Sequence, residues 1–287
     1  MRQGIGKGAV RCSGCSGCGR LVSGERYWER ILRKGGTLGL LFLAGALGLV
    51  WVFKPLIPGP LYRDPPRDLP WELPDYRGAE TEWHVAQDGR IHNRVEHFFL
   101  SGITPQMLAW FYRQLPEAEV EYRGVVYPLY HIFHPTEHGR LRVLEPAADG
   151  RPGMAVGALV EREEWFGPYD SRGAARIAEF SPAGFLALPQ VSGFSLGEVR
   201  HSFEGSQRGT TYRVEAIKGS DIPLLGVAIN YFVRTRVFHP EMLAQWQRHQ
   251  VEEVSSLQFF LPALYAQRDT GTRLRLPADF PASTKIE

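Results

Sequence analysis

Two histidine-bearing segments of this sequence carry residue types that ligate metal ions. The first, "YHIFHPTEHGRL" (130–141), places three imidazoles and one carboxylate within eight residues: His131, His134, Glu137 and His138. Imidazole nitrogens and carboxylate oxygens are ordinary ligands of zinc and related ions. Taken alone, the segment is as typical of a polar loop on the rim of a sheet as of a metal site.

The second segment lies near the C-terminus, where His249 and Glu253 are four residues apart in "RHQVEEVSSL". On a helix these side chains stack on one face and can offer a nitrogen and an oxygen to the same ion. Trp246 and Leu257 continue this stripe, so the pair falls in an apolar row, where buried His and Glu need a partner such as a metal. A solvent-facing hydrogen bond within the pair is the alternative.

Further candidates fall on predicted strands. In "VEREEWFG" (160–167), Glu161 and Glu163 share one strand face and Glu164 points away. His201 of "EVRHSFEG" has Ser202 on the opposite face. The sequence contains no HExxH motif, Gly-rich phosphate loop or GxSxG elbow, which argues against the common zincins, nucleotide enzymes and serine hydrolases. A metal site here must therefore be assembled from distant segments.

The elements that position these residues follow from local patterns. Thr104 as N-cap and Pro105 at the first helical position predict a short amphipathic helix in "ITPQMLAWFYRQL". Pro240 near a second start, with apolar residues at helical intervals, predicts a long C-terminal helix. Between them, seven segments separated by Gly, Pro and Asp predict strands: "GVVYPLYHIF", "GRLRVLEP", "GMAVGALVERE", "ARIAEFSP", "EVRHSFEGS", "GTTYRVEAIKG" and "GVAINYFVRTRVF".

These elements predict an α+β fold of the helix-grip type, in which a curved antiparallel sheet surrounds a long C-terminal helix and leaves a cavity between them. With 287 residues and 44% hydrophobic content, the chain can build one sizeable core, which we assign to residues 79–287. The proline-rich residues 54–78 cannot form a helix and predict an extended tether or a strap laid over the surface.

The N-terminal part has a different composition. The residues before Gly35 carry eight Lys or Arg against two Glu, whereas the whole chain has a net charge of only +2. The body is therefore mildly acidic, and a role in binding nucleic acid has no electrostatic support. Cys12, Cys15 and Cys18 are the only cysteines, and their Ser-Gly spacers and missing fourth ligand argue against a metal cluster.

The uncharged residues 36–53 are long enough to span a bilayer as a helix. Basic residues precede this stretch, so the positive-inside rule predicts a single-pass anchor with residues 1–35 in the cytoplasm and the domain outside. A cleaved signal peptide and a wrongly chosen start codon are the alternatives.

Five segments in chain order carry a resemblance to a known family: "ITPQMLAWFYRQL", "YHIFHPTEH", "EREEWFG", "EVRHSFEG" and "RHQVEEVSSLQFFLPALY". They resemble the 2,4-diacetylphloroglucinol hydrolases, which are zinc enzymes that cleave the carbon–carbon bond between an acyl group and a phenolic ring. The similarity spans about residues 103–267. It implies Zn²⁺ as cofactor and four ligands: His134, Glu163 (with Glu161 as the alternative), His249 and Glu253.

The resemblance also implies roles around the metal. His201 matches a family histidine near the acyl group and would deliver the proton to the departing ring carbon, while Tyr127 and Tyr212 match substrate-facing phenols. Phe111, Trp165 and Trp246 would hold the flat ring. Two features depart from the family, because Glu137 replaces its Asp and an anchor is not expected of a soluble enzyme.

The expected function is therefore hydrolysis of the bond between an acyl group and a polyphenol ring by a Zn²⁺-dependent enzyme, with release of a carboxylic acid. The alternative is a membrane-tethered helix-grip protein that binds a hydrophobic ligand without turnover, because such cavities serve both purposes. The sequence leaves monomer and homodimer open.

Overall fold

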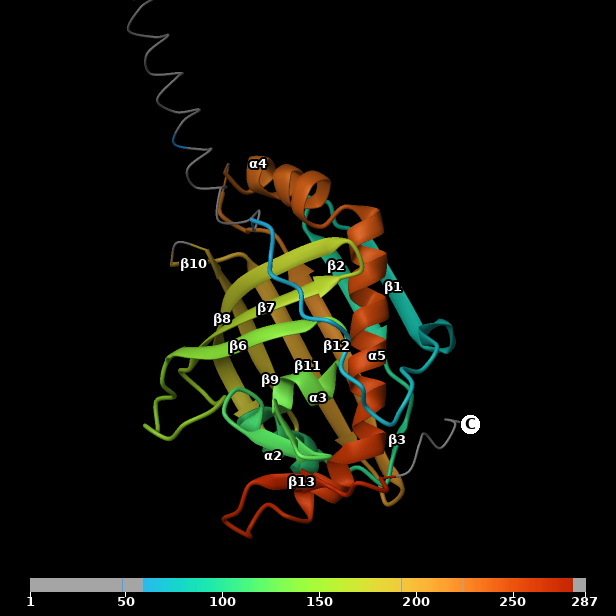
Figure 1. Ribbon diagram of the computed structural model, residues 1–287. Coiled ribbons are helices and arrows are strands. Elements are labelled where there is room, and N and C mark those ends of the chain that lie inside the picture. The colour runs from blue at the N-terminus through green and yellow to red at the C-terminus, as the bar shows by residue number, and fades with distance from the viewer. Residues whose placement is uncertain (1–47, 49–58, 192, 224, 281–287) are drawn as a thin grey trace, which may run out of the picture. The chain divides into compact units, whose positions relative to one another are not determined.

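The computed structural model describes residue 48 and residues 59–191, 193–223 and 225–280 (Figure 1). The cysteine segment lies outside this range, and so does the predicted anchor except for Gly48. Within the described part of the chain, no helix is both long and apolar enough to cross a membrane.

The described residues build one large sheet of ten strands, all paired antiparallel. The main order is β1-β2-β12-β11-β9-β8-β7-β6, with β10 beside β9 and β3 beside β12. The strands are β1 (Glu80–Val85), β2 (Ile91–Glu96), β3 (Leu100–Ser101), β6 (His138–Glu145), β7 (Leu159–Phe166), β8 (Tyr169–Ser181), β9 (Gly184–Val191), β10 (Phe194–Ser195), β11 (Gly197–Gly205) and β12 (Gly209–Lys218).

Helices cover one face of this sheet. The long α5 (Pro240–Tyr265) runs across the sheet and contacts β2, β3 and β7, as Figure 1 shows. We call the sheet face toward α5 the inner face. The remaining elements are α2 (Pro105–Gln114), α3 (Leu129–Phe133), α4 (Leu225–Phe232), the 3-10 turn η2 (Tyr76–Gly78), the π-helical turn η3 (Val233–Val237) and a small sheet of β13 (Leu274–Leu276), β4 (Glu119–Tyr122) and β5 (Val125–Pro128).

Local signals fix the two helices that the sequence predicts. The Thr104 hydroxyl accepts the Met107 N–H at 3.3 Å and caps α2, whose Leu108 and Phe111 are fully buried. Pro240 occupies the first turn of α5, where its missing N–H costs nothing. The curved antiparallel sheet with its C-terminal helix confirms the helix-grip part of the fold prediction.

The proline-rich segment packs against the domain. From residue 59 to residue 75 it contains no helix or strand, yet Trp71 is buried and lies 5.4 Å from Phe260 of α5, measured between ring centroids. The Arg67 guanidinium donates to the carbonyl of His138 at 2.8 Å. These residues form a strap along the domain, which is one of the two arrangements expected for them.

Two strand predictions were wrong, because "GVVYPLYHIF" is helical in its second half and "GVAINYFVRTRVF" is helical almost throughout. Pro128 cannot donate to a sheet ladder, so β5 ends there and Leu129 begins α3, which buries Ile132 and Phe133 in the core. In "GVAINYFVRTRVF", Asn230 binds the backbone N–H and carbonyl of Ser220 and the carbonyl of Asp88. Those hydrogen bonds fix α4 through the Asn230 side chain. The alternation of polar and apolar residues that predicted a strand therefore does not decide the structure of this segment. The strands β1 and β2 precede the region predicted as sheet and were not foreseen.

Candidate functional site

Four buried side chains converge where α5 crosses β6 and β7. The Nε2 atoms of His138 and His249 are 3.2 Å apart, and the Glu253 Oε2 lies 3.1 Å from the first and 3.6 Å from the second. The Glu164 Oε2 lies 3.9 Å from His138 Nε2 and 3.8 Å from His249 Nε2. We call His138, Glu164, His249 and Glu253 the His/Glu cluster.

Secondary structure brings these four residues together in pairs. His138 begins β6 and is directly paired with Glu164 of β7, so the two side chains share the inner face. His249 and Glu253 lie one turn apart on α5, as the i,i+4 spacing predicts. The packing of α5 against β7 then joins the pairs.

Hydrogen bonds on the far side of each imidazole orient the two rings. His138 Nδ1 lies 2.7 Å from the Tyr130 carbonyl, to which only a protonated nitrogen can donate. His249 Nδ1 lies 2.9 Å from Glu137 Oε2, a carboxylate that holds the ring N–H. Both assignments leave Nε2 as an acceptor, which is the form that ligates a metal.

When Glu253 is deprotonated, the cluster gathers four acceptor atoms. Two imidazole nitrogens and two carboxylate oxygens face one another, and the Tyr130 hydroxyl supports Glu164 from outside at 2.8 Å. In a tetrahedral zinc site with bonds of about 2.0–2.1 Å, donor atoms are about 3.3 Å apart. The measured separations of 3.1 to 3.9 Å surround that value. The residues thus fit a divalent cation.

Burial sets the protonation of the cluster in the metal-free protein. It lowers the pKa of His138 and of His249 well below the ordinary value, and the neighbouring imidazoles lower both further. It raises the pKa of the Glu253 carboxyl well above the ordinary value. Neutral imidazoles are ready to ligate, whereas Glu253 must lose its proton when a metal binds.

The structure corrects two of the predicted ligands. Glu163 pairs with Arg172 at 2.6 Å on the outer face of β7, because successive strand residues alternate between faces. Glu161 also faces outward and pairs with Arg142. Glu164, which the sequence analysis placed on the opposite face from them, is the glutamate that reaches the cluster.

His134 lies beside the cluster and not in it. Its ring stacks on His249 with centroids 4.4 Å apart, and its Nε2 is 3.3 Å from Glu252 Oε2. The donor atoms of His134, Glu137 and His249 lie within 4.8 Å of one another, which makes them a second possible ligand group. However, Glu137 already binds Arg248, the Gly167 N–H and His249 Nδ1. We therefore assign His134 and Glu137 to the support of His249.

A second polar group lies on the inner face, at β11 and β12. His201 Nδ1 is 2.6 Å from the Tyr212 hydroxyl, which is 2.5 Å from the Tyr112 hydroxyl of α2. Burial lowers the pKa of His201 to about 3, and the charge of His97 adds to the effect, so the imidazole is neutral near pH 7. Tyr212 thus lies beside His201, and Tyr112, which the sequence analysis did not single out, completes the group.

The remaining candidates are spread over the domain. Tyr127 is on β5 of the small sheet, paired with Val120, and so is on a different sheet from His201 and Tyr212. Phe111 and Trp246 are core residues, and Trp165 lies under the Arg63 guanidinium on the opposite face of β7 from Glu164. His131 is held away from the cluster by its contact with the Gly139 carbonyl at 2.6 Å.

Small side chains line the middle of the inner face. Strand pairing places Gly173, Ala175, Ala187 and Val199 there, in line with Arg162 and Val160 of β7. All four are only partly buried, and a Cβ added at Gly173 would meet no atom within 4 Å. The position beside Gly173 on the inner face is therefore open.

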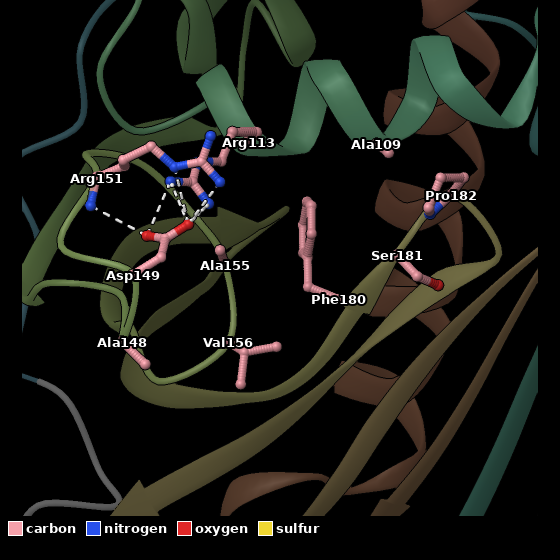
Figure 2. Close-up of a pocket in the computed structure, with 10 residues that line it drawn as sticks. All are labelled: Ala109, Arg113, Ala148, Asp149, Arg151, Ala155, Val156, Phe180, Ser181 and Pro182. Carbon is pink, nitrogen blue, oxygen red and sulfur yellow. Dashed lines mark hydrogen bonds and ion pairs between the residues drawn. The ribbon is translucent and has the colours of Figure 1, made fainter.

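Figure 2 shows a separate hollow of about 470 Å³ beside α2 and the end of β8. Its one carboxylate, Asp149, is bound by Arg113 and Arg151. The backbone N–H of Arg151 and the Arg113 side chain lower the pKa of Asp149 to about 2. The hollow therefore has no free ionised group to offer a ligand, and we do not assign function to it.

No protein-family model and no curated protein sequence matches the chain. Among solved structures, Ara h 8.0201 is 11% identical with a TM-score of 0.37 and is matched over 64% of this chain and 99% of its own. A START superfamily protein from Mycobacterium smegmatis is 14% identical with a TM-score of 0.34, over 57% and 98% of the two chains. Protein NE0264 from Nitrosomonas europaea is 11% identical with a TM-score of 0.34, over 61% and 97%.

These comparisons correct the functional prediction. None of the three similar structures is described as a hydrolase, and one is described as a START superfamily protein. The prediction of a zinc-dependent C–C hydrolase is therefore wrong, and the catalytic role of His201 falls with it. The alternative expected from the sequence is a helix-grip protein that binds a ligand.

Proposed function

We propose that this protein binds a small, mainly apolar molecule between the inner face of its sheet and α5. The observation that carries the proposal is the row of small residues opposite the helix. Gly173, Ala175 and Ala187 stand where large side chains would fill the space, and a Cβ at Gly173 would touch nothing within 4 Å. Small, partly exposed side chains at these positions leave room for an occupant between sheet and helix.

Aromatic and aliphatic side chains supply the surroundings for an apolar ligand. Val160, Ile177 and Phe185 are buried on the same face, and the Phe185 ring stacks on His201 with centroids 4.0 Å apart. Such walls stabilise an apolar molecule mainly by removing its surface from water.

We further propose that the His/Glu cluster holds a divalent transition metal at one wall of this space. Its two imidazoles and two carboxylates suit zinc, the metal expected from the sequence, and also iron, manganese or cobalt. When bound, such an ion would offer a further coordination position to an oxygen or nitrogen of the ligand or to water.

Two neighbouring alanines allow a direct test of the ligand site. Ala175 faces inward beside Val160, whereas Ala174 is paired with Glu161 on the outer face. The neutral dye N-phenyl-1-naphthylamine brightens in apolar surroundings, so its fluorescence titration reports binding. We expect Ala175→Phe to weaken dye binding by about tenfold or more by filling the space, and Ala174→Phe to leave it unchanged. Equal behaviour of the two variants, or no dye binding to the wild type, would contradict the proposal.

Membrane attachment through residues 36–53 stays a prediction, as does homodimer formation. If the segment is an anchor, the full chain expressed in bacteria should remain in the membrane fraction after alkaline carbonate washing. A chain that begins at Leu61 should be released.

A further inference from the structure

Lys218 is a lysine buried inside the domain. It ends β12 on the inner face, and its side chain is enclosed so that the residue is 7% exposed. Its Nζ lies 4.0 Å from the ring centroid of Phe238 and 4.3 Å from that of Trp246. Within the described part of the chain, no carboxylate lies within 4 Å of this ammonium group. Buried lysines are normally paired, because an isolated charge is costly away from water.

The side-chain amide of Asn93 is a second hydrogen-bond donor next to Lys218. Asn93 is 4% exposed, and its Nδ2 has no hydrogen-bond partner among the residues that the structure describes. Strand pairing sets Asn93 opposite Ala216 and Ile91 opposite Lys218, so Asn93 and Lys218 are diagonal neighbours on the inner face. We call Asn93 and Lys218 the donor pair.

The orientation of the Asn93 amide follows from its neighbour on α5. Gln247 Nε2 donates to the Glu82 carbonyl at 3.2 Å, which identifies that atom as the nitrogen of its amide. The same nitrogen lies 2.8 Å from Asn93 Oδ1, so the Asn93 atom facing Gln247 must be the oxygen. Asn93 Nδ2 therefore points away from Gln247 with its donors free.

Arg162 adds a second positive charge on the inner face. It is two residues from Glu164 along β7 and so shares the inner face with it, because strand residues alternate between faces. Ser171 and Glu164 bind it from one side. Positive charges from β7 and β12 thus face the space in which we propose that the ligand binds.

We propose that the donor pair holds a carboxylate of the bound molecule, so that the ligand is an apolar or aromatic carboxylic acid. Both carboxylate oxygens would accept hydrogen bonds, from Lys218 Nζ and Asn93 Nδ2, and the rings of Phe238 and Trp246 would exclude water from the pair. The apolar part would extend along the small residues in the middle of the inner face. This inference rests on the proposed function and names the chemical class of its ligand.

The test compares an acid with its neutral amide. 2-Naphthylacetic acid and 2-naphthylacetamide have the same ring and nearly the same shape, and calorimetric titration of the full chain at about pH 6.5 measures both affinities. We expect the wild type to bind the acid about tenfold more tightly than the amide. Lys218→Met, a neutral residue of similar length, should abolish this preference. Arg208→Met removes a cation from an exposed position outside the inner face and should retain it.

Asn93→Ala provides a second variant in case Lys218→Met fails to fold, and it should reduce the preference about threefold. Equal affinity of the wild type for acid and amide would overturn the inference and leave the proposed function standing. A preference that survives in both variants would also overturn it, because the carboxylate would then be bound elsewhere, for example at the His/Glu cluster. Failure of the wild type to bind either compound would contradict the proposed function itself.

Discussion

The inner face carries two buried polar groups of opposite character. With Glu253 deprotonated, the His/Glu cluster presents two nitrogens and two oxygens that all accept, whereas the donor pair presents an ammonium and an amide N–H₂ that find no acceptor among the described residues. A buried polar group without its partner costs about 1–3 kcal/mol, and more when it is charged. The contrast underlies both proposals, because a cation would complete the first group and an anion the second.

A third group on the same face shows what a completed network looks like. His201, Tyr212 and Tyr112 bind one another over distances of 2.6 and 2.5 Å and need no added partner. We therefore expect mutations in the three groups to have different effects on metal content, ligand preference and stability.

The largest effect is expected at His249. Its Nε2 is one of the four facing atoms of the His/Glu cluster, and its Nδ1 is hydrogen-bonded to Glu137. His249→Ala should lose the bound metal while the fold survives. Elemental analysis should find about one metal ion per chain in the wild type and less than a tenth of that in the variant. His84→Ala, on the exposed edge strand β1, is the matched control and should keep the metal. Stoichiometric metal in His249→Ala would refute the assignment.

The next experiment separates the two adjacent glutamates of β7. Glu164→Gln should weaken metal binding by at least about 100-fold, because loss of a ligand costs more than the 10- to 100-fold typical of loss of a ligand's hydrogen-bond partner. Glu163→Gln removes only a surface ion pair with Arg172 and should leave the affinity within about twofold. Competition against a chelator measures both constants. If Glu163→Gln weakened metal binding and Glu164→Gln did not, Glu163 would be the ligand, and the face of β7 that carries Glu163 would have to face α5.

Lys218→Met should stabilise the ligand-free protein in a pH-dependent way. Burial lowers the pKa of Lys218 from 10.5 in the unfolded chain to about 7, with a further contribution from the charge of Arg162. Below pH 7 lysine is protonated in both states, so the folded wild type bears the full cost of a buried ammonium. Between about pH 7 and 10.5 only the unfolded state binds the proton, and the stability of the wild type rises with pH.

The gain from Lys218→Met is thus on the order of a few kcal/mol below pH 7 and shrinks toward pH 10.5. Urea unfolding of both proteins at about pH 6, 8 and 10 measures the difference in their free energies of unfolding. The contributions of titratable groups that both proteins share cancel in this difference. A gain that does not change with pH would mean that Lys218 is not a buried, depressed amine.

The smallest effect is expected in the completed network. Tyr112→Phe removes one hydroxyl but leaves the Tyr212 hydroxyl bound to His201, so it should lower the free energy of unfolding by about 1 kcal/mol and the melting temperature by about 2–4 °C. Metal content and the preference for acid over amide should not change. A loss of metal in this variant would show that the three groups are coupled.

Much of the site was open to prediction because it depends on local geometry. His249 and Glu253 are one helical turn apart in any helix that contains them, and the apolar stripe through Trp246 indicated that this helix face is buried. Likewise Thr104 and Pro105 predict the start of α2 from residues that are adjacent in the chain.

The errors share a different cause. The segment "VEREEWFG" can place Glu163 or Glu164 inward, since the side-chain period of a strand is two and a shift of one residue exchanges the faces. The choice was made by the pairing of His138 with Glu164, two residues 26 positions apart whose register depends on the rest of the sheet. Similarly, α4 is held by Asn230 binding the backbone of Ser220 and Asp88, the second of which lies 142 positions away in the sequence.

By itself the sequence determined the long helix, its His and Glu pair and the antiparallel character of the sheet, because helical spacing and turn chemistry act between near neighbours. Only the tertiary structure decided that His138 and Glu164, and not His134 and Glu163, meet that pair. It also decided that Lys218 and Asn93 are buried as donors that meet no acceptor in the described part of the chain. Strand register and the packing of α5 on the sheet join residues far apart in the chain, and no local pattern specifies which of two alternating faces will be covered.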